Sequence, residues 1–246
     1  MKKFIGKAIF VVAVYTIGFA FWIVFSIFKL IGKVRIVNPD NLPRLKPGTI
    51  IISNHPDLMD CMYEIFLIPA LFYSQFFFHP LKCSPYFTLD KKNFKDKWYW
   101  NWWLGDRAIA IQRGAGNGRV AEAKEIVDVL GVHKGIIVHF GEGGRTCTGN
   151  KFQLSPSGKR KIRPLKPSVG WLVLKTQACV ITIWLENGPM IHQPGKRLFS
   201  LPKLRRGEIV VKIGKTMEAN KKLMAMSPSE LTEIISANLL ELADQE

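Results

Sequence analysis

The amino-acid sequence predicts an α/β fold in which a mixed, largely parallel sheet is flanked by helices, with a membrane helix at the amino terminus. Segments typical of strands alternate with segments of helical periodicity along most of the chain, as in layered α/β proteins. Residues 135–140 are almost continuously apolar, as expected of a strand that is buried on both faces. Residues 8–28 contain no charged residue, which predicts the membrane helix.

The amino-terminal apolar segment is long enough for a membrane span, because about 20 apolar residues in a helix cross the hydrocarbon core. A cleaved signal peptide would have an apolar core of roughly 7–15 residues followed by small residues, whereas Phe25, Ile27 and Phe28 are large. Basic residues flank the segment on both sides: Lys2, Lys3, Lys7, Lys29, Lys33 and Arg35. Both flanks therefore favour a cytoplasmic, anionic lipid surface. One span, a shallow or re-entrant segment bent at Gly18, and a buried core helix all remain possible.

The rest of the chain is expected to form one catalytic or binding domain, residues 36–246, after an anchor of residues 1–35. The predicted strands are 34–37, 49–53, 108–112, 135–140, 180–185 and 208–213. The predicted helices are 60–78, with a kink or break at Pro69, then 117–130, 166–177 and a terminal helix to about residue 242. Ser227, Pro228 and Glu230 have the spacing of a capping box, which places the start of the terminal helix.

Composition limits the partners and the compartment. The chain has 35 Lys and Arg against 19 Asp and Glu, a net charge of +16, so its surface should attract phosphate groups of lipid or nucleic acid. No zinc finger, basic zipper or RNA-binding aromatic signature is present in the sequence, and a nucleic-acid partner is therefore disfavoured. The four cysteines show no paired spacing, which indicates a reducing compartment.

A first candidate site follows the strand predicted at 49–53, where ligands bind in open α/β sheets. His55 and Asp60 are five residues apart, and a carboxylate bonded to one imidazole nitrogen lets the other accept a proton from a hydroxyl. The pair is therefore a candidate general base. The same spacing also suits a structural histidine beside a helix-capping Asp57. A metal site through these three residues lacks a further cluster of ligands.

A second candidate site follows the strand at 135–140, in residues 140–146, FGEGGRT. Its glycines let backbone N–H groups approach an anion, and Arg145 provides a forked donor suited to phosphate. Glu142 could orient that arginine or hold a substrate hydroxyl, although a simple glycine-rich turn remains an alternative. Residues 143–185 contain eight basic residues and no acid, namely Lys151, Lys159, Lys161, Lys166, Lys175, Arg145, Arg160 and Arg163.

With these blocks, the chain resembles the 1-acylglycerol-3-phosphate acyltransferase family of membrane glycerolipid acyltransferases. Residues 54–60, NHPDLMD, are similar to the family's first block, a histidine followed by four residues and an aspartate. Residues 140–146 are similar to its FPEGTRS block, with Gly141 in place of the proline and Gly144 in place of the threonine. Residues 105–113, ending in Arg113, and residues 166–183 follow two further blocks in outline.

The resemblance implies that His55, oriented by Asp60, deprotonates the free hydroxyl of lysophosphatidic acid, which attacks the thioester of acyl-CoA or acyl-carrier protein. It also implies a set of residues that hold the acceptor: Arg113, Glu142, Gly143, Gly144, Arg145 and Thr146. No metal or cofactor is required beyond the acyl thioester co-substrate. The product would be phosphatidic acid, made at the cytoplasmic side of a membrane.

Two other functions remain open. Because the phosphate-binding blocks depart from the family pattern, the acceptor could be another lysophospholipid or a non-glycerol hydroxyl compound. From a different class, the chain could be a non-enzymatic protein that binds an anionic membrane surface through its basic residues.

Overall fold

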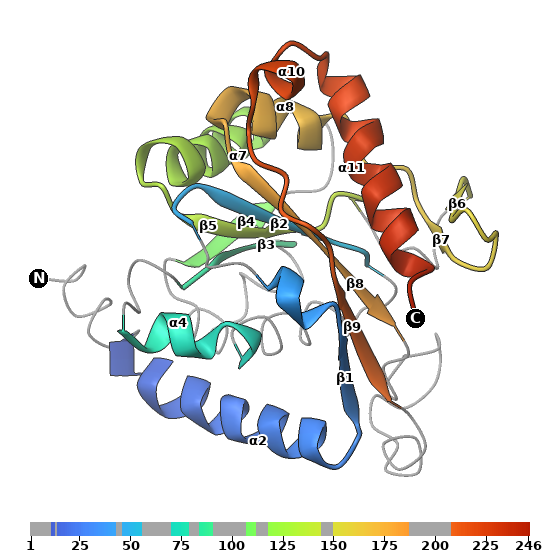
Figure 1. Ribbon diagram of the computed structural model, residues 1–246. Helices are drawn as coiled ribbons and strands as arrows, with labels where there is room; N and C mark the ends of the chain where they lie inside the picture. Colours follow the sequence, from blue (N-terminus) through green and yellow to red (C-terminus); the bar gives the residue numbers. More distant parts are fainter. Residues whose placement is uncertain are drawn as a thin grey trace, which may run out of the picture.

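A seven-stranded sheet forms the centre of the molecule in the computed structural model (Figure 1). The structure describes residues 11–12, 14–42, 46–55, 70–78, 84–90, 107–111, 118–143, 150–186 and 208–246. The strands are β1 (Val34–Val37), β2 (Thr49–Ser53), β3 (Tyr86–Asp90), β4 (Ala108–Ile111), β5 (Ile136–His139), β8 (Cys179–Glu186) and β9 (Ile209–Ile213). Their order across the sheet is β1-β9-β8-β2-β5-β3-β4.

The sheet is mixed and largely parallel, as the sequence predicted. Only β8 and β9 pair antiparallel among these neighbours, and every other neighbouring pair is parallel. The apolar run at 135–140 that was predicted to be a buried strand is β5, with three of its four residues buried; all five residues of its neighbour β2 are also buried, and six of the eight in β8. Strands β2, β5 and β8 are therefore central because both their faces need cover.

Helices cover one face of the sheet from the second half of the chain (Figure 1). They are α7 (Gly118–Val127), which runs into a π-helical turn η5 (Asp128–Val132), α8 (Ser168–Thr176), the short α10 (Lys221–Met224) and α11 (Pro228–Ala243). Leu130, Val169 and Leu239 of these helices pack with Ile50 and Ile137 of the sheet in one core cluster. The capping box predicted at Ser227 is present at the start of α11.

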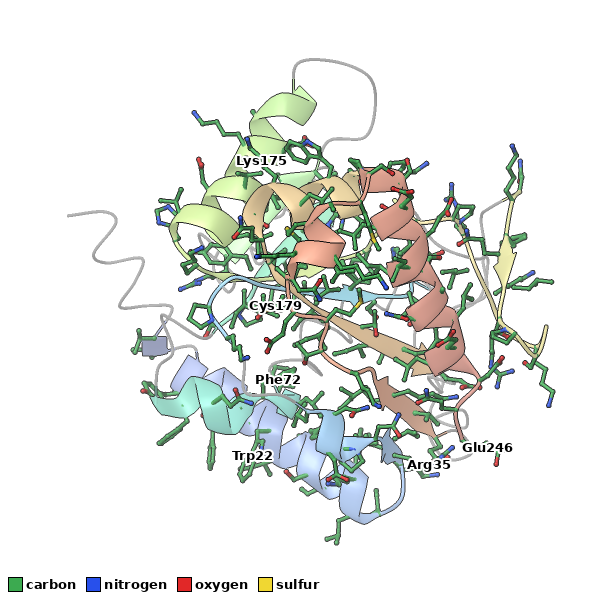
Figure 2. The ribbon with its side chains drawn as sticks, turned by 45° about the horizontal axis from the view of Figure 1, so that its top comes forward. Trp22, Arg35, Phe72, Lys175, Cys179 and Glu246 are labelled. Carbon is green, nitrogen blue, oxygen red and sulfur yellow. The ribbon has the colours of Figure 1, made fainter. Side chains whose placement is uncertain are left out.

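The opposite face carries the amino-terminal helix α2 (Phe19–Leu30) and α4 (Tyr73–Phe78). Here Phe72, which Figure 2 shows between α2 and the sheet, packs with Ile51, Val138 and Ile181. Alternate residues of β2 thus belong to different cores, since successive side chains of a strand point to opposite faces. A small antiparallel hairpin, β6 (Gln153–Leu154) and β7 (Lys161–Ile162), lies beside the carboxyl end of the chain.

The single apolar helix predicted over residues 8–28 is not found in the part of the chain that the structure describes. A π-helical turn η1 (Val14–Gly18) precedes α2, and α2 continues past the predicted end to Leu30. Its 12 residues measure about 18 Å at ~1.5 Å per residue, against ~30 Å of bilayer hydrocarbon. Among the described residues, no helix combines the length and the apolar character that a bilayer crossing needs.

Other differences concern shorter elements. Strand β3, the β6–β7 hairpin and α10 were not predicted from the sequence. The helix predicted at 60–78 lies mostly outside the described residues, and α4 occupies its end. The helix predicted at 117–130 ends two residues later, because η5 continues it to Val132.

Candidate active site

Two predicted sites meet at one edge of the sheet. Because β8, β2 and β5 are parallel neighbours, their carboxyl ends lie together. His55 follows β2 by two residues, and Glu142 follows β5 by three. The backbone N–H of His55 donates a hydrogen bond of 2.7 Å to Oε1 of Glu142. The histidine block and the glycine-rich block therefore build a single site.

His55 is held in a fixed place at this edge. His55 is only 6% exposed, and its ring lies 4.5 Å, centroid to centroid, from the ring of Phe140. The backbone bond to Glu142 fixes the main chain at the same point. Asp60, the predicted partner of the imidazole, lies outside the described residues, so the His55–Asp60 pair stays a prediction.

Glu142 is fully buried, and both of its carboxylate oxygens accept backbone hydrogen bonds. Oε1 accepts from His55, and Oε2 accepts from the N–H of Arg163 at 2.8 Å. A buried carboxylate needs such donors, and bonds of this charge-assisted kind are among the stronger ones in proteins. The sequence suggested that Glu142 orients an arginine or holds a hydroxyl. These bonds show that it also joins the loop of His55 to the segment after β7.

Asn54 is a site residue that the sequence analysis missed. It is 2% exposed and bonds across the sheet to β8: its Oδ1 accepts from the N–H of Leu185 at 2.8 Å, and its Nδ2 donates to the carbonyl of Leu185 at 2.9 Å. The available signal was an asparagine directly between a buried strand and the candidate base. An amide can supply both a donor and an acceptor, which a backbone group at a strand end needs.

The glycine-rich turn is closed by Gly143, whose φ of +65° favours glycine. Its N–H donates to the carbonyl of Phe140 at 3.3 Å, so this amide is used within the turn. The side chain of Lys166 lies over the glycine, since its Cε would be 3.2 Å from an added Cβ. The side chain of Lys166, which ends in an amine, therefore packs beside the predicted phosphate loop. Four further predicted residues lie outside the described ones: Arg113, Gly144, Arg145 and Thr146.

No three acidic, histidine or cysteine side chains gather closely enough to hold a metal ion within the described residues. Asp57 and Asp60, two ligands of the metal hypothesis, lie outside them. The absence of a cofactor requirement stays a prediction.

A second histidine, His139, ends β5 but has different surroundings. Its Nδ1 lies 3.1 Å from Oγ1 of Thr88, and burial lowers the pKa of its imidazole to about 4. A base with that pKa accepts a proton poorly at neutral pH. His139 is thus suited to a structural role.

The comparisons with known proteins agree with this geometry. Residues 33–186, more than half of the chain, match the family model Acyltransferase, so the chain belongs to the Acyltransferase family and is an acyltransferase. Among solved structures it is similar to the 1-acyl-sn-glycerophosphate (LPA) acyltransferase PlsC from Thermotoga maritima, with a TM-score of 0.51 and 18% identity. That match covers 88% of this chain and 75% of the other, and at this identity it concerns the fold. No curated protein sequence matches the chain.

Proposed function

We propose that the protein is a membrane-bound enzyme that transfers a fatty acyl group from a thioester to the free hydroxyl of lysophosphatidic acid, giving phosphatidic acid. The observation that carries the proposal is His55 at the carboxyl end of β2, inside the region that matches the Acyltransferase family, held by Glu142 at 2.7 Å. The similarity in fold to an LPA acyltransferase supports this choice of acceptor.

The proposed chemistry is direct transfer without an acyl-enzyme. His55 removes the proton from the acceptor hydroxyl as its oxygen attacks the thioester carbonyl, forming the new C–O bond. The tetrahedral intermediate collapses, the C–S bond breaks, and the proton on His55 goes to the departing thiolate. Asp60 would keep the imidazole in the required tautomer. Holding both substrates beside one base contributes much of the rate in such a reaction.

The acceptor phosphate is proposed to bind at the glycine-rich turn. Arg113, Arg145, Thr146 and the backbone at Gly144 would hold it, with Gly143 shaping the turn and the Lys166 amine adding positive charge nearby. Glu142, whose oxygens already accept two backbone bonds, would support this binding from inside the protein. The proposed donor is an acyl thioester, either acyl-CoA or acyl-carrier protein.

The proposed membrane contact is the outer face of α2 together with α4. Phe19, Trp22, Ile27, Leu30 and Phe77 are all more than a third exposed, and in Figure 2 Trp22 lies at the edge of the molecule opposite α8 and α11. Apolar patches of this kind mark interaction surfaces. A helix in the plane of the interface fits the short α2, with the domain on the cytoplasmic side.

An acceptor panel tests the proposed function. Purified protein in detergent is given acyl-CoA or acyl-carrier protein with lysophosphatidic acid, other lysophospholipids or non-glycerol alcohols, and products are identified by mass spectrometry. We expect phosphatidic acid to form fastest. Faster acylation of another acceptor would reassign the substrate, as the departures at Gly141 and Gly144 allow.

Vesicle sedimentation tests the membrane contact. We expect the chain to sediment with vesicles that contain phosphatidylglycerol, and the double variant Trp22→Ser, Ile27→Ser to sediment less. A matched variant on the other face of the sheet, Trp171→Ser, should sediment like the wild type. Equal sedimentation of all three proteins would contradict the α2 contact.

A further inference from the structure

The main chain of β2 leaves the sheet at a place where one neighbour, β8, continues. The ladder between β2 and β8 ends at Ser53 and Ile183, whereas β8 runs on to Glu186. The N–H and carbonyl of Leu185 are therefore beyond the last backbone partner that β2 provides. Buried backbone groups need partners, and the side chain of Asn54 supplies both.

The same replacement occurs on the other side of β2. Its ladder with β5 ends at the pair of Ile52 and His139. Beyond this pair, the next backbone N–H on the β5 side of the chain is that of His55. It donates to the Glu142 carboxylate. Side chains thus extend both ladders by one step, and they do so at the candidate base and the residue before it.

The partners of these two side chains are themselves fixed. Leu185 pairs with Val211 in the antiparallel β8–β9 ladder, and the following residue, Glu186, lies 3.1 Å from the buried amine of Lys212. Arg163 follows the fully buried Ile162 of β7. The imidazole of His55 is consequently carried on a main chain that is bonded to β8 on one side and, through Glu142, to the segment after β7 on the other.

We propose that Asn54 and Glu142 are positioning residues that set the place of His55 for proton transfer; this rests on the proposed function. Neither side chain needs to touch a substrate for this role. Reacting groups must be held to a fraction of an ångström, and a shift of about 1 Å costs roughly a hundredfold in rate. Asn54, for which the sequence predicted no role of its own, provides the cleaner test.

The variants Asn54→Ala and Asn54→Asp are compared with the wild type in the acyl transfer assay. Asn54→Asp keeps an acceptor for the N–H of Leu185 but sets an oxygen against its carbonyl. We expect kcat to fall roughly tenfold to a hundredfold in both variants, with KM for each substrate within about threefold, because the lost interaction acts on the chemical step. Thermal unfolding shows which variant is folded. The kinetics of either folded variant are enough to test the positioning role.

A matched control is Asn41→Ala, since Asn41 also donates from its side-chain amide to a strand carbonyl, that of Ile213 at 2.9 Å, away from the site. We expect its kcat to equal that of the wild type. Combining Asn54→Ala with His55→Ala should cause no loss beyond that of His55→Ala, because Asn54 acts through the histidine.

Histidine imidazole NMR signals give a readout that does not depend on turnover. The His55 signal, assigned by its absence in His55→Ala, should shift or broaden in Asn54→Ala but not in Asn41→Ala. An unshifted signal, an unchanged kcat or a rise in KM alone would overturn the positioning role. A wild type that turns over no donor with any acceptor would instead refute the proposed function, and the NMR comparison would still test the position of His55.

Discussion

His55 and His139 lie at the ends of two neighbouring parallel strands, yet they are held in different ways. His139 is inside β5, paired in register with Ile52 of β2, so the sheet ladder fixes its backbone. The hydroxyl of Thr88 donates to the carbonyl of Val138 at 3.2 Å, and Nδ1 of His139 is then the donor to Thr88 Oγ1. His55 lies past the end of β2, where side chains replace the ladder.

This difference teaches where a histidine can work as a base in such a sheet. Inside the strand, the His139 imidazole is bonded to Thr88, and burial lowers its pKa to about 4. Beyond the strand, the main chain has left the sheet and can carry the imidazole toward a substrate at the carboxyl edge. We therefore propose the catalytic role for His55, which side chains hold, and a structural role for His139, which the ladder holds.

Replacing the two histidines should give the largest contrast. We expect His55→Ala to lower kcat by about 10²- to 10⁴-fold, the usual contribution of a general base. His139→Asn, which keeps an N–H donor near Thr88, should remain within about threefold of the wild type. Thiol release from the acyl donor measures both. A larger loss in His139→Asn than in His55→Ala would reverse the assignment.

Glu142→Gln should have the next largest effect. The glutamine side chain has one acceptor oxygen for two backbone N–H donors. Its own NH₂ group would face the second of these donors, which is unfavourable. We expect kcat to fall roughly tenfold to a hundredfold with little change in KM, and stability to fall by about 1 to 3 kcal/mol. Steady-state kinetics and urea unfolding measure the two effects. A selective rise in KM for the acceptor would mean that Glu142 binds substrate instead.

The pH dependence of unfolding should reveal His139. Its folded pKa of about 4 is below the unfolded value of 6.5, so the unfolded chain binds a proton first as the pH falls. This contribution to stability is complete above pH 6.5 and is lost progressively between 6.5 and 4, by up to about 3 kcal/mol. Urea unfolding across this range should show a shallower slope for His139→Asn. Equal slopes in the wild type and His139→Asn would contradict a lowered pKa of His139.

The smallest effect is expected at a site far from the carboxyl edge. Ser227 caps α11, accepting from the N–H of Glu230 at 3.3 Å and donating its own N–H to the Glu230 carboxylate at 2.7 Å. Ser227→Ala should cost about 1 kcal/mol of stability while kcat stays within twofold. Denaturant unfolding and the transfer assay check this together. A drop in kcat here would mean that activity follows overall stability rather than the placement of His55.

Much of the fold could be predicted from the sequence, because burial on both faces leaves a continuous apolar pattern. Strands β1 and β2 have the predicted bounds, and β5 and β8 differ by a residue at each end. The start of α11 was predicted from its capping residues. The predicted blocks at His55 and Glu142 do meet at one edge, which parallel strands require.

The remaining features depend on contacts that a local pattern does not carry. The role of Asn54 depends on its bonds to Leu185, which is distant in the chain. Leu185 lies on β8, and this strand continues past the end of β2. Strand β3 is as long as β2, but Thr88 lies in its middle and Asp90 at its end, so its sequence lacks a continuous apolar run. At the amino terminus, the lack of charge predicted a long span, but Phe25 and Phe28 pack against the core and α2 is short.

The most direct test of the account is whether thiol release from the acyl donor requires the acceptor. Wild type is mixed with acyl-CoA or acyl-carrier protein, with and without lysophosphatidic acid, and the intact protein mass is recorded in the same samples. Direct transfer with His55 as the base predicts release only when both substrates are present, no added acyl mass, and loss of release in His55→Ala. An acylated protein that forms without acceptor, or undiminished release by folded His55→Ala, would contradict it.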